Sequence, residues 1–323
     1  MLKAVKILSV LFLLLIVVLL WLLRGGFATF KTSPYPIPRQ SSQTWDEVLK
    51  KPSSITVTTF DTGEIKMDQA QNLDPNNSKI KSFQHGDEPL PVLAHLLHHD
   101  RYGDFLIDTG FGDSFSANPP FGNYSDPMRL LNWVSGIKNG QQSGHNIAAQ
   151  LKRHEVHLNA VFFTHLHPDH TAGVVELPQN IDYVFGKKEN WFLARAFIGD
   201  HFDGKKNLKT INFTNVPDML PLGPAVDIFG DGSLWAVSTP GHTRDHISYI
   251  VNAKTGPILL AGDASQFSWA FENDVAPRGL NKAETMLAQK SLEQLIAFSA
   301  TYPKVKIIFG HGFPKDHTLR APR

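Results

Sequence analysis

Apolar and polar residues follow one another along most of the chain in short blocks of two kinds. β-rich apolar runs, several bounded by Gly or Pro, predict strands, and stretches with helical spacing of apolar residues predict helices. We expect the strands at 55–60, 92–97, 105–108, 160–164, 183–185, 226–229, 234–238, 247–251, 258–261 and 305–309. We expect the helices at 145–154, 187–197 and 282–300. Because no internal repeat or low-complexity tract interrupts this pattern, it indicates one mixed α/β domain over residues 53–323.

The N-terminal segment has a different pattern. Residues 7–23 are an apolar run with one serine, flanked by lysines before it and an arginine after it. As a helix this run would be about 26 Å long at about 1.5 Å per residue, just enough to span a bilayer. We therefore expect residues 1–24 to be a membrane anchor, with the catalytic domain facing the periplasm or exterior. A cleaved signal peptide that releases the chain into the periplasm is the alternative.

Three stretches lack a periodic pattern. Residues 25–52 hold several prolines among Ser, Gln and Arg, which predicts an extended, solvated linker. Residues 111–144 and 199–224 predict long loops, and loops of this length are usually functional or disordered. Their aromatic residues fit either an apolar lid over a substrate or ordinary packing within the loops.

Composition narrows the classes of function. The chain of 323 residues has no cysteine, which excludes disulfides, thiolate metal sites and cysteine nucleophiles. Its 31 Lys+Arg nearly balance its 30 Asp+Glu, so we expect no nucleic-acid partner recruited by bulk charge. It has 15 histidines, and imidazole is both the commonest metal ligand and an acid or base near neutral pH. The spacing of the histidines therefore matters most.

The densest group of histidines directly follows the strand predicted at 160–164. It comprises His165, His167, Asp169 and His170. In extended backbone His165 and His167 project to the same side, whereas Asp169 and His170 fall in the following turn and can aim at a neighbouring point. This spacing favours two adjacent cations. A solvated, histidine-rich turn without a metal is the alternative.

The same layout recurs at three later strand ends. In each, an apolar strand and a glycine precede a ligand-type side chain, namely His242, Asp263 or His311. A single histidine after a strand is usually a surface residue, but four such strand ends in one chain are hard to ascribe to chance. Imidazole and carboxylate without thiolate suit Zn²⁺, Fe²⁺ or Mn²⁺, and a carboxylate between two imidazole sets suits a bridge.

The order of these residues resembles the metallo-β-lactamase superfamily, and the resemblance covers roughly residues 53–315. It extends to an upstream Asp-Thr-Gly signature that begins at Asp108. The resemblance implies an α/β fold, an αββα sandwich of two mixed β-sheets with a dinuclear site at one edge. In this chain we expect that sandwich to be preceded by the N-terminal transmembrane helix.

Position by position, the resemblance also implies a ligand set for two divalent cations, expected to be Zn²⁺ with Fe²⁺ or Mn²⁺ as alternatives. The first cation would be held by His165, His167 and His242. The second would be held by Asp169, His170 and His311, and Asp263 would bridge the two. Asp108 would support the ligands from outside the set. We expect the same of His246 because it lies four residues after His242.

Within the superfamily the pattern is most similar to the N-acyl homoserine lactonase-like branch. The segments 59–63 and 263–266 and the short spacing from His242 to Asp263 support this branch. Enzymes that cleave β-lactams generally lack a bridging carboxylate there, so β-lactamase activity is less expected. Those lactonases often place a tyrosine three residues after the bridging Asp, where it contacts the substrate carbonyl. This chain has Gln266, whose amide NH₂ could donate a similar hydrogen bond.

The expected function is hydrolysis of a small-molecule lactone or other carboxylic ester. A hydroxide shared by the two cations would be the nucleophile, and one cation would polarise the carbonyl. Asp169 would bind metal through one oxygen, accept the hydroxide proton with the other and deliver it to the leaving alkoxide. The alternatives are hydrolysis of a thioester, as in glyoxalase II, or of a phosphodiester. A β-lactamase or a non-catalytic metal-binding protein is less favoured.

Overall fold

The computed structural model describes residues 9, 12–20, 29–40, 43–83 and 89–313 of the chain. Within those ranges, no helix has both the length and the apolar character that crossing a membrane requires. The structure therefore does not support the expected transmembrane helix, and the rest of the predicted anchor lies outside the described residues.

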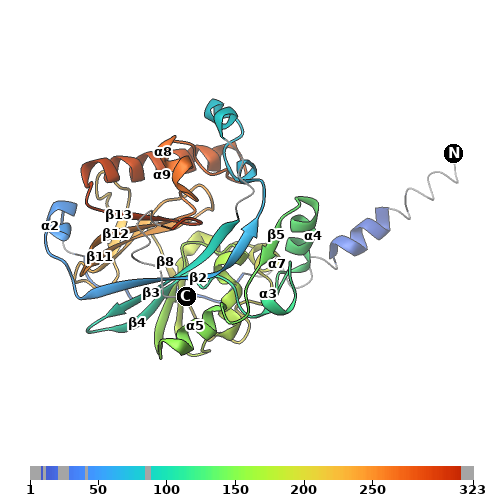
Figure 1. Cartoon of the computed structure of the whole chain (residues 1–323), viewed down its shortest axis with the longest axis horizontal. Coiled ribbons are helices and arrows are strands. Elements are labelled where there is room, and N and C mark those ends of the chain that lie inside the picture. Colours follow the sequence, from blue (N-terminus) through green and yellow to red (C-terminus); the bar gives the residue numbers. More distant parts are fainter. Residues whose placement is uncertain (1–8, 10–11, 21–28, 41–42, 84–88, 314–323) are drawn as a thin grey trace.

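Two mixed β-sheets form the centre of the domain (Figure 1). The larger sheet has the strand order β1-β8-β7-β6-β4-β3-β2-β5. Along this order, neighbouring strands are parallel from β1 through β8, β7 and β6 to β4. They are antiparallel from β4 through β3 and β2 to β5. Its strands are β1 (Ser33–Pro34), β2 (Ile55–Lys66), β3 (Leu90–His99), β4 (Gly103–Ile107), β5 (Lys138–Gly140), β6 (Leu158–Phe162), β7 (Asp182–Gly186) and β8 (Asn207–Ile211).

The smaller sheet has the order β13-β12-β11-β10-β9. Its strands are antiparallel except for the parallel pair β12 and β13. They are β9 (Ala225–Asp227), β10 (Leu234–Ser238), β11 (Ile247–Ala253), β12 (Gly256–Gly262) and β13 (Lys306–Phe309). The prediction of two mixed sheets is confirmed.

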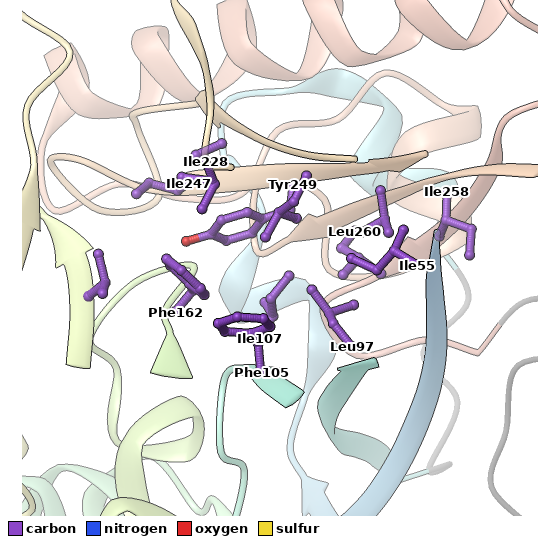
Figure 2. Close-up of a cluster of buried hydrophobic side chains, with 14 of the residues drawn as sticks. Ile55, Leu97, Phe105, Ile107, Phe162, Ile228, Ile247, Tyr249, Ile258 and Leu260 are labelled. Atoms are coloured by element: carbon purple, nitrogen blue, oxygen red, sulfur yellow. The ribbon is translucent and has the colours of Figure 1, made fainter. Parts of the chain in front are cut away.

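The main core lies between the two sheets (Figure 2). Ile55, Leu97 and Phe162 of the larger sheet meet Tyr249 and Leu260 of the smaller one, and all five are buried. The Tyr249 hydroxyl donates a hydrogen bond to the Phe163 carbonyl at 2.9 Å, which satisfies its one polar group in an apolar layer. Burial of this layer fixes the two sheets against each other, and with them the strand ends at each edge.

Helices cover the outer faces of both sheets. α9 (Lys282–Thr301) lies across the smaller sheet (Figure 1), where its buried Leu295 and Phe298 pack on that sheet's outer face. Its N-terminus is capped by the Asn281 side chain, which accepts from the Glu284 N–H at 3.0 Å. The larger sheet is covered by α5 (Ile147–Arg153) and α7 (Ala194–Ile198). The other helices are α2 (Trp45–Leu49), α3 (Ser114–Ala117), α4 (Asp126–Val134), α6 (Pro168–Thr171) and α8 (Ser268–Glu272).

Each predicted strand is present, with ends shifted by a few residues, and the helices predicted at 145–154 and 282–300 are α5 and α9. The helix predicted at 187–197 is wrong as one element. It is divided into a 3₁₀ turn, Lys187–Glu189, and α7. The division follows from Glu189, whose side chain is turned into the protein instead of continuing a solvated helical face.

The stretches without a periodic pattern hold more structure than expected. Residues 111–144 include α3, α4 and β5, and residues 199–224 include β8. Part of the segment 25–52, expected as a solvated linker, packs on the domain. Trp45 is 1% exposed and donates from its indole N–H to the Met219 carbonyl at 2.7 Å. Short elements of this kind are held by tertiary contacts, which local sequence patterns do not report.

Candidate metal centre

The predicted ligands lie at the ends of four strands that share one edge of the two sheets. β6 of the larger sheet leads into the loop of His165 and His167 and then into α6, which carries Asp169 and His170. In the smaller sheet, His242 follows β10, Asp263 follows β12 and His311 follows β13. Because the sheets are packed face to face, their strand ends bring these side chains into one cluster.

Two glycines let the ligand-bearing backbone come this close together. Gly262 has φ of +54°, a conformation that favours glycine, and a Cβ there would lie 2.8 Å from Nε2 of His246. A Cβ at Gly310 would overlap Oδ1 of Asp263. Each glycine directly precedes a predicted ligand, so the glycine in the strand-end pattern serves close packing as well as turning.

The side chains of the first predicted set, His165, His167 and His242, each place a possible ligand atom within 4.8 Å of the others. Nε2 of His242 faces Nδ1 of His167 at 3.0 Å. The second set, Asp169, His170 and His311, forms a similar group. Oδ2 of Asp169 lies 3.4 Å from Nε2 of His170 and 3.5 Å from Nε2 of His311.

Asp263 reaches both groups. Its Oδ2 is 3.3 Å from Nε2 of His242 in the first group and 3.5 Å from Nε2 of His311 in the second. Its Oδ1 is 3.5 Å from Nε2 of His170. A carboxylate between two sets of imidazoles is the arrangement that a bridge between two cations requires.

Asp108 supports the second group through a hydrogen bond to His170. It stands at the end of β4 with a φ of +58°, and its carboxylate accepts the Thr164 N–H at 2.8 Å and the Thr164 hydroxyl at 2.7 Å. It also accepts the Nδ1–H of His170 at 2.8 Å, which leaves Nε2 of that ring free to bind a cation. His311 is oriented in the same way, because its Nδ1–H donates to the Pro91 carbonyl at 2.9 Å.

His246 supports Asp263 through the backbone. Its Nε2 accepts the Asp263 N–H at 3.0 Å, so its proton is on Nδ1, which donates to the Thr239 hydroxyl oxygen at 2.8 Å. Burial lowers the pKa of His246 well below its usual value, which keeps the ring neutral in this role. Both nitrogens of His246 are therefore used within the protein.

Burial and neighbouring charges shift the pKa values of the histidines in the two groups in opposite directions. Burial lowers the pKa of His165 and His167, and it lowers the pKa of His242 to about 3, so these rings are neutral ligands at pH 7. Burial also acts on His170 and His311, but the neighbouring carboxylates outweigh it and raise both pKa values. Asp263 is buried too, yet His311 and His170 hold its pKa well below the usual range.

Several polar atoms of the cluster are buried without a hydrogen-bond partner among the described residues. They are Nε2 of His165, Nε2 of His170, Nδ1 of His242 and Oδ1 of Asp263. Leaving a buried polar atom unpaired typically costs about 1–3 kcal/mol. Of these residues, His165, His170 and Asp263 each place a possible ligand atom within 4.8 Å of the others, so they fit divalent cations bound by nitrogen and oxygen.

Gln266 lies at the cluster, but its amide is engaged differently from the prediction. Its Nε2 donates to Oδ2 of Asp263 at 2.8 Å, and its backbone carbonyl accepts the His311 N–H at 2.8 Å. Its Oε1 is buried and has no hydrogen-bond partner among the described residues. The amide that was expected to donate to a substrate carbonyl instead donates to the predicted bridging carboxylate.

A cavity of about 510 Å³ opens over the cluster. Its floor includes His167, Asp169, His242, Asp263, Gln266 and His311. One part of its wall is apolar, with Met67, Leu90, Met128, Leu131, Phe197 and Ile198 among the lining residues. Another part carries cationic side chains, namely Lys188, Arg244 and Arg278. The cavity can therefore hold an amphiphilic molecule with one polar group over the cluster.

Sequence analysis did not identify Glu189, which also lines this cavity. Burial raises the pKa of Glu189 to about 7, and its only sequence signal was a polar stretch after a strand, typical of a solvated helix. Tyr124 is buried against Phe111 and Phe115, and burial together with the nearby Asp169 raises its pKa. Of the aromatic residues in and around the two predicted loops, which fitted either a lid or ordinary packing, Tyr124, Trp191 and Phe197 line the cavity, whereas others such as Phe111 and Phe213 belong to the core.

Comparison with known proteins gives relatives named N-acyl homoserine lactonase and hydroxyacylglutathione hydrolase. The N-acyl homoserine lactonase AttM of Agrobacterium fabrum is 28% identical over 245 residues, which cover 73% of this chain and 87% of that protein. AttM of Azorhizobium caulinodans is 26% identical over 246 residues, with the same coverage. The hydroxyacylglutathione hydrolase of Hahella chejuensis is 36% identical over a shorter stretch of 118 residues, 36% of this chain and 37% of that one.

Solved structures of other proteins have the same fold as this chain. The B. thuringiensis protein AiiA, solved with N-decanoyl-L-homoserine bound at its active site, superposes with a TM-score of 0.61 at 23% identity. That match covers 80% of this chain and 94% of the other. The family described as the metallo-beta-lactamase superfamily matches residues 87–311, which include the whole strand-end cluster. The chain therefore belongs to the metallo-beta-lactamase superfamily.

Proposed function

We propose that this protein is a dinuclear metal-dependent hydrolase that opens a lactone or cleaves another carboxylic ester. The observation that carries the proposal is the position of Asp263, whose two oxygens lie 3.3–3.5 Å from imidazole nitrogens of both groups. One carboxylate between two three-residue groups fits two neighbouring cations better than one. The kinship with proteins named N-acyl homoserine lactonase supports lactones as the first substrates to test.

His165, His167 and His242 would hold one cation, and Asp169, His170 and His311 the other, with Asp263 between them. When bound, Zn²⁺ or another divalent cation would supply a water-derived nucleophile at neutral pH and polarise the substrate carbonyl. The surrounding residues keep the ligands in place, since Asp108 fixes the tautomer of His170 and Pro91 that of His311.

Asp169 is the residue we propose for proton transfer. Its Oδ2 faces His170 and His311, and the residue also lines the cavity where a substrate would lie. Its carboxylate can therefore accept the proton released from the attacking water and give it to the oxygen that leaves the carbonyl carbon. In a lactone that oxygen stays attached to the product, so the reaction yields a hydroxy acid.

A thioester of an anionic thiol is the second candidate substrate. The observation that favours it is the cationic part of the wall, with Lys188, Arg244 and Arg278, which would attract the carboxylates of such a thiol. The similarity to hydroxyacylglutathione hydrolases agrees with this candidate over part of the chain.

The test is hydrolysis of an N-acyl homoserine lactone by the purified, zinc-loaded protein, followed as proton release at constant pH. We expect turnover that a chelator abolishes, and a loss of about 10²–10⁴-fold in kcat in Asp169→Asn. Asp182→Asn, at a carboxylate that only pairs with Lys209 at 2.7 Å, is the matched control and should be unchanged. Two metals per chain with thioester but no lactone hydrolysis would favour the second candidate. Turnover that survives the chelator would contradict the proposal.

A further inference from the structure

Glu189 is a buried carboxylate that connects two of the ligand-bearing loops. It lies at the end of the 3₁₀ turn after β7 and is 5% exposed. Its Oε2 accepts the backbone N–H of Leu166 at 3.3 Å, and its Oε1 accepts the backbone N–H of Asp245 at 2.9 Å. Leu166 stands between His165 and His167, and Asp245 lies three residues after His242. One side chain therefore contacts the backbone of both loops that present the first group.

The connection is reciprocal. Oδ2 of Asp245 accepts the backbone N–H of Lys188 at 2.9 Å, so the segment 186–189 and the loop after β10 each donate to a carboxylate of the other. The two backbones are packed closely at this point, because a Cβ at Gly186 would overlap the carbonyl oxygen of Asp245. The position of Glu189 relative to the loop of His242 is thus fixed by more than one contact.

A buried carboxylate is costly unless it is satisfied, and Glu189 forms no ion pair among the described residues. Its carboxylate accepts two backbone N–H groups, one on each loop, and the side chain of Thr243, the residue after His242, also interacts with it. An amide cannot replace it fully, because Gln offers one acceptor oxygen where Glu offers two. In Glu189→Gln, an NH₂ group would face one of the two backbone donors.

We propose that Glu189 is the positioning residue of the first metal group, and that its two-sided hydrogen bonding sets the distance of His165 and His167 from His242. This inference rests on the proposed metal function of the cluster. Glu189 contacts none of the three rings directly; it acts on the backbone that carries them. Its loss should therefore weaken the first cation site and leave the second, which Asp108 supports, largely unchanged.

The experiment is a zinc titration of the full chain against a chromophoric chelator, which reports the affinity of each site without any substrate. We expect Glu189→Gln to weaken one of the two sites by about 10–100-fold, the range typical of residues that orient metal ligands. The matched control is Asp227→Asn. Asp227 is also buried and accepts backbone N–H groups, from Gly230 at 2.9 Å for example, but it lies beside the opposite end of β10.

The same substitution made in a second variant, His242→Ala, shows which of the two metal sites is affected. In His242→Ala, which should retain only the second site, Glu189→Gln should cause no further loss of affinity. A further loss there, or an equal loss in Asp227→Asn, would overturn the proposal, as would two sites of unchanged affinity in Glu189→Gln. If Glu189→Gln does not fold, Asp245→Ala removes the acceptor of the reciprocal bond and decides in the same way, with a smaller effect. A parent protein that binds no zinc would instead refute the metal function itself.

Discussion

The ligand cluster and the wall of the cavity above it are built in different ways. The cluster comes from four strand ends at one edge of two sheets, and its members are held by buried hydrogen bonds to Asp108, His246 and Pro91. The wall comes largely from α4, α7 and the segments around them, which lie outside the sheets, with a few residues from strand ends such as Leu90 of β3. The cluster is therefore fixed by the core of the fold, whereas the wall depends on local contacts between surface segments.

Those local contacts are few and specific. Nδ1 of His201 accepts the Thr171 hydroxyl at 2.9 Å, and its Nε2–H lies 3.4 Å from the Asn123 carbonyl oxygen. Asn123 donates from its side chain to the Ala172 carbonyl at 2.9 Å, and the Ser125 hydroxyl donates to the Phe197 carbonyl at 2.9 Å. The bonds of His201 and Asn123 attach both long segments to the turn after His170, and that of Ser125 attaches the first segment to α7. The wall can thus change its lining while the ligands stay in place.

The largest effect should follow from removing a ligand. His242→Ala takes away one of three imidazoles of the first group, so we expect one bound metal in place of two. Turnover should fall by more than the roughly 10–100-fold typical of changes outside the ligand set. Metal analysis and kcat on the same preparation measure both. Because His242 is 10% exposed at its side chain and packs outside the sheet core, the fold should survive. Two metals in this variant would show that the first group is wrongly assigned.

An effect on stability should come from the attachment of the wall. Burial lowers the pKa of His201 to about 4 from the usual 6.5 of an unfolded chain. Protonation therefore favours the unfolded state. The stabilisation from a neutral His201 is complete above pH 6.5 and is lost as the pH falls towards 4, by up to about 3 kcal/mol.

His201→Gln tests this, because glutamine does not titrate. The free energy of unfolding of the parent protein should fall more steeply between pH 6.5 and 4 than that of the variant. The difference between the two proteins cancels the contribution of the other buried histidines. If the free energies of unfolding of the two proteins changed with pH in parallel, His201 would not be the source of this pH dependence.

The ligand cluster could be predicted from the sequence, whereas contacts between segments remote in the chain could not. The strand ends were predictable because an apolar run, a glycine and a ligand-type residue are adjacent in the chain, as at Gly262 and Asp263. Glu189 was not, since its partners Leu166 and Asp245 are remote in sequence and are reached only after the sheets pack. The engagement of the Gln266 amide with Asp263 was also hidden, because the residue type fits a substrate contact equally well. Short elements such as β5 are held by pairing with β2, which no local pattern reveals.

The smallest effect should come from the lining of the wall, where two phenylalanines of one segment allow a matched comparison. Phe197 lines the cavity, whereas Phe192 is 56% exposed and lies outside the lining. If an acyl chain occupies the apolar wall, Phe197→Ala should lower kcat/KM for long-chain lactones about 10-fold relative to short-chain ones. Phe192→Ala should leave that ratio within about 2-fold, because Phe192 is largely exposed and does not line the cavity. Zinc content should be the same in both variants, since neither residue touches the ligands. An equal change in the two ratios would mean that the acyl chain does not lie along this wall, and the division between a fixed cluster and an adjustable wall would then have to be drawn elsewhere.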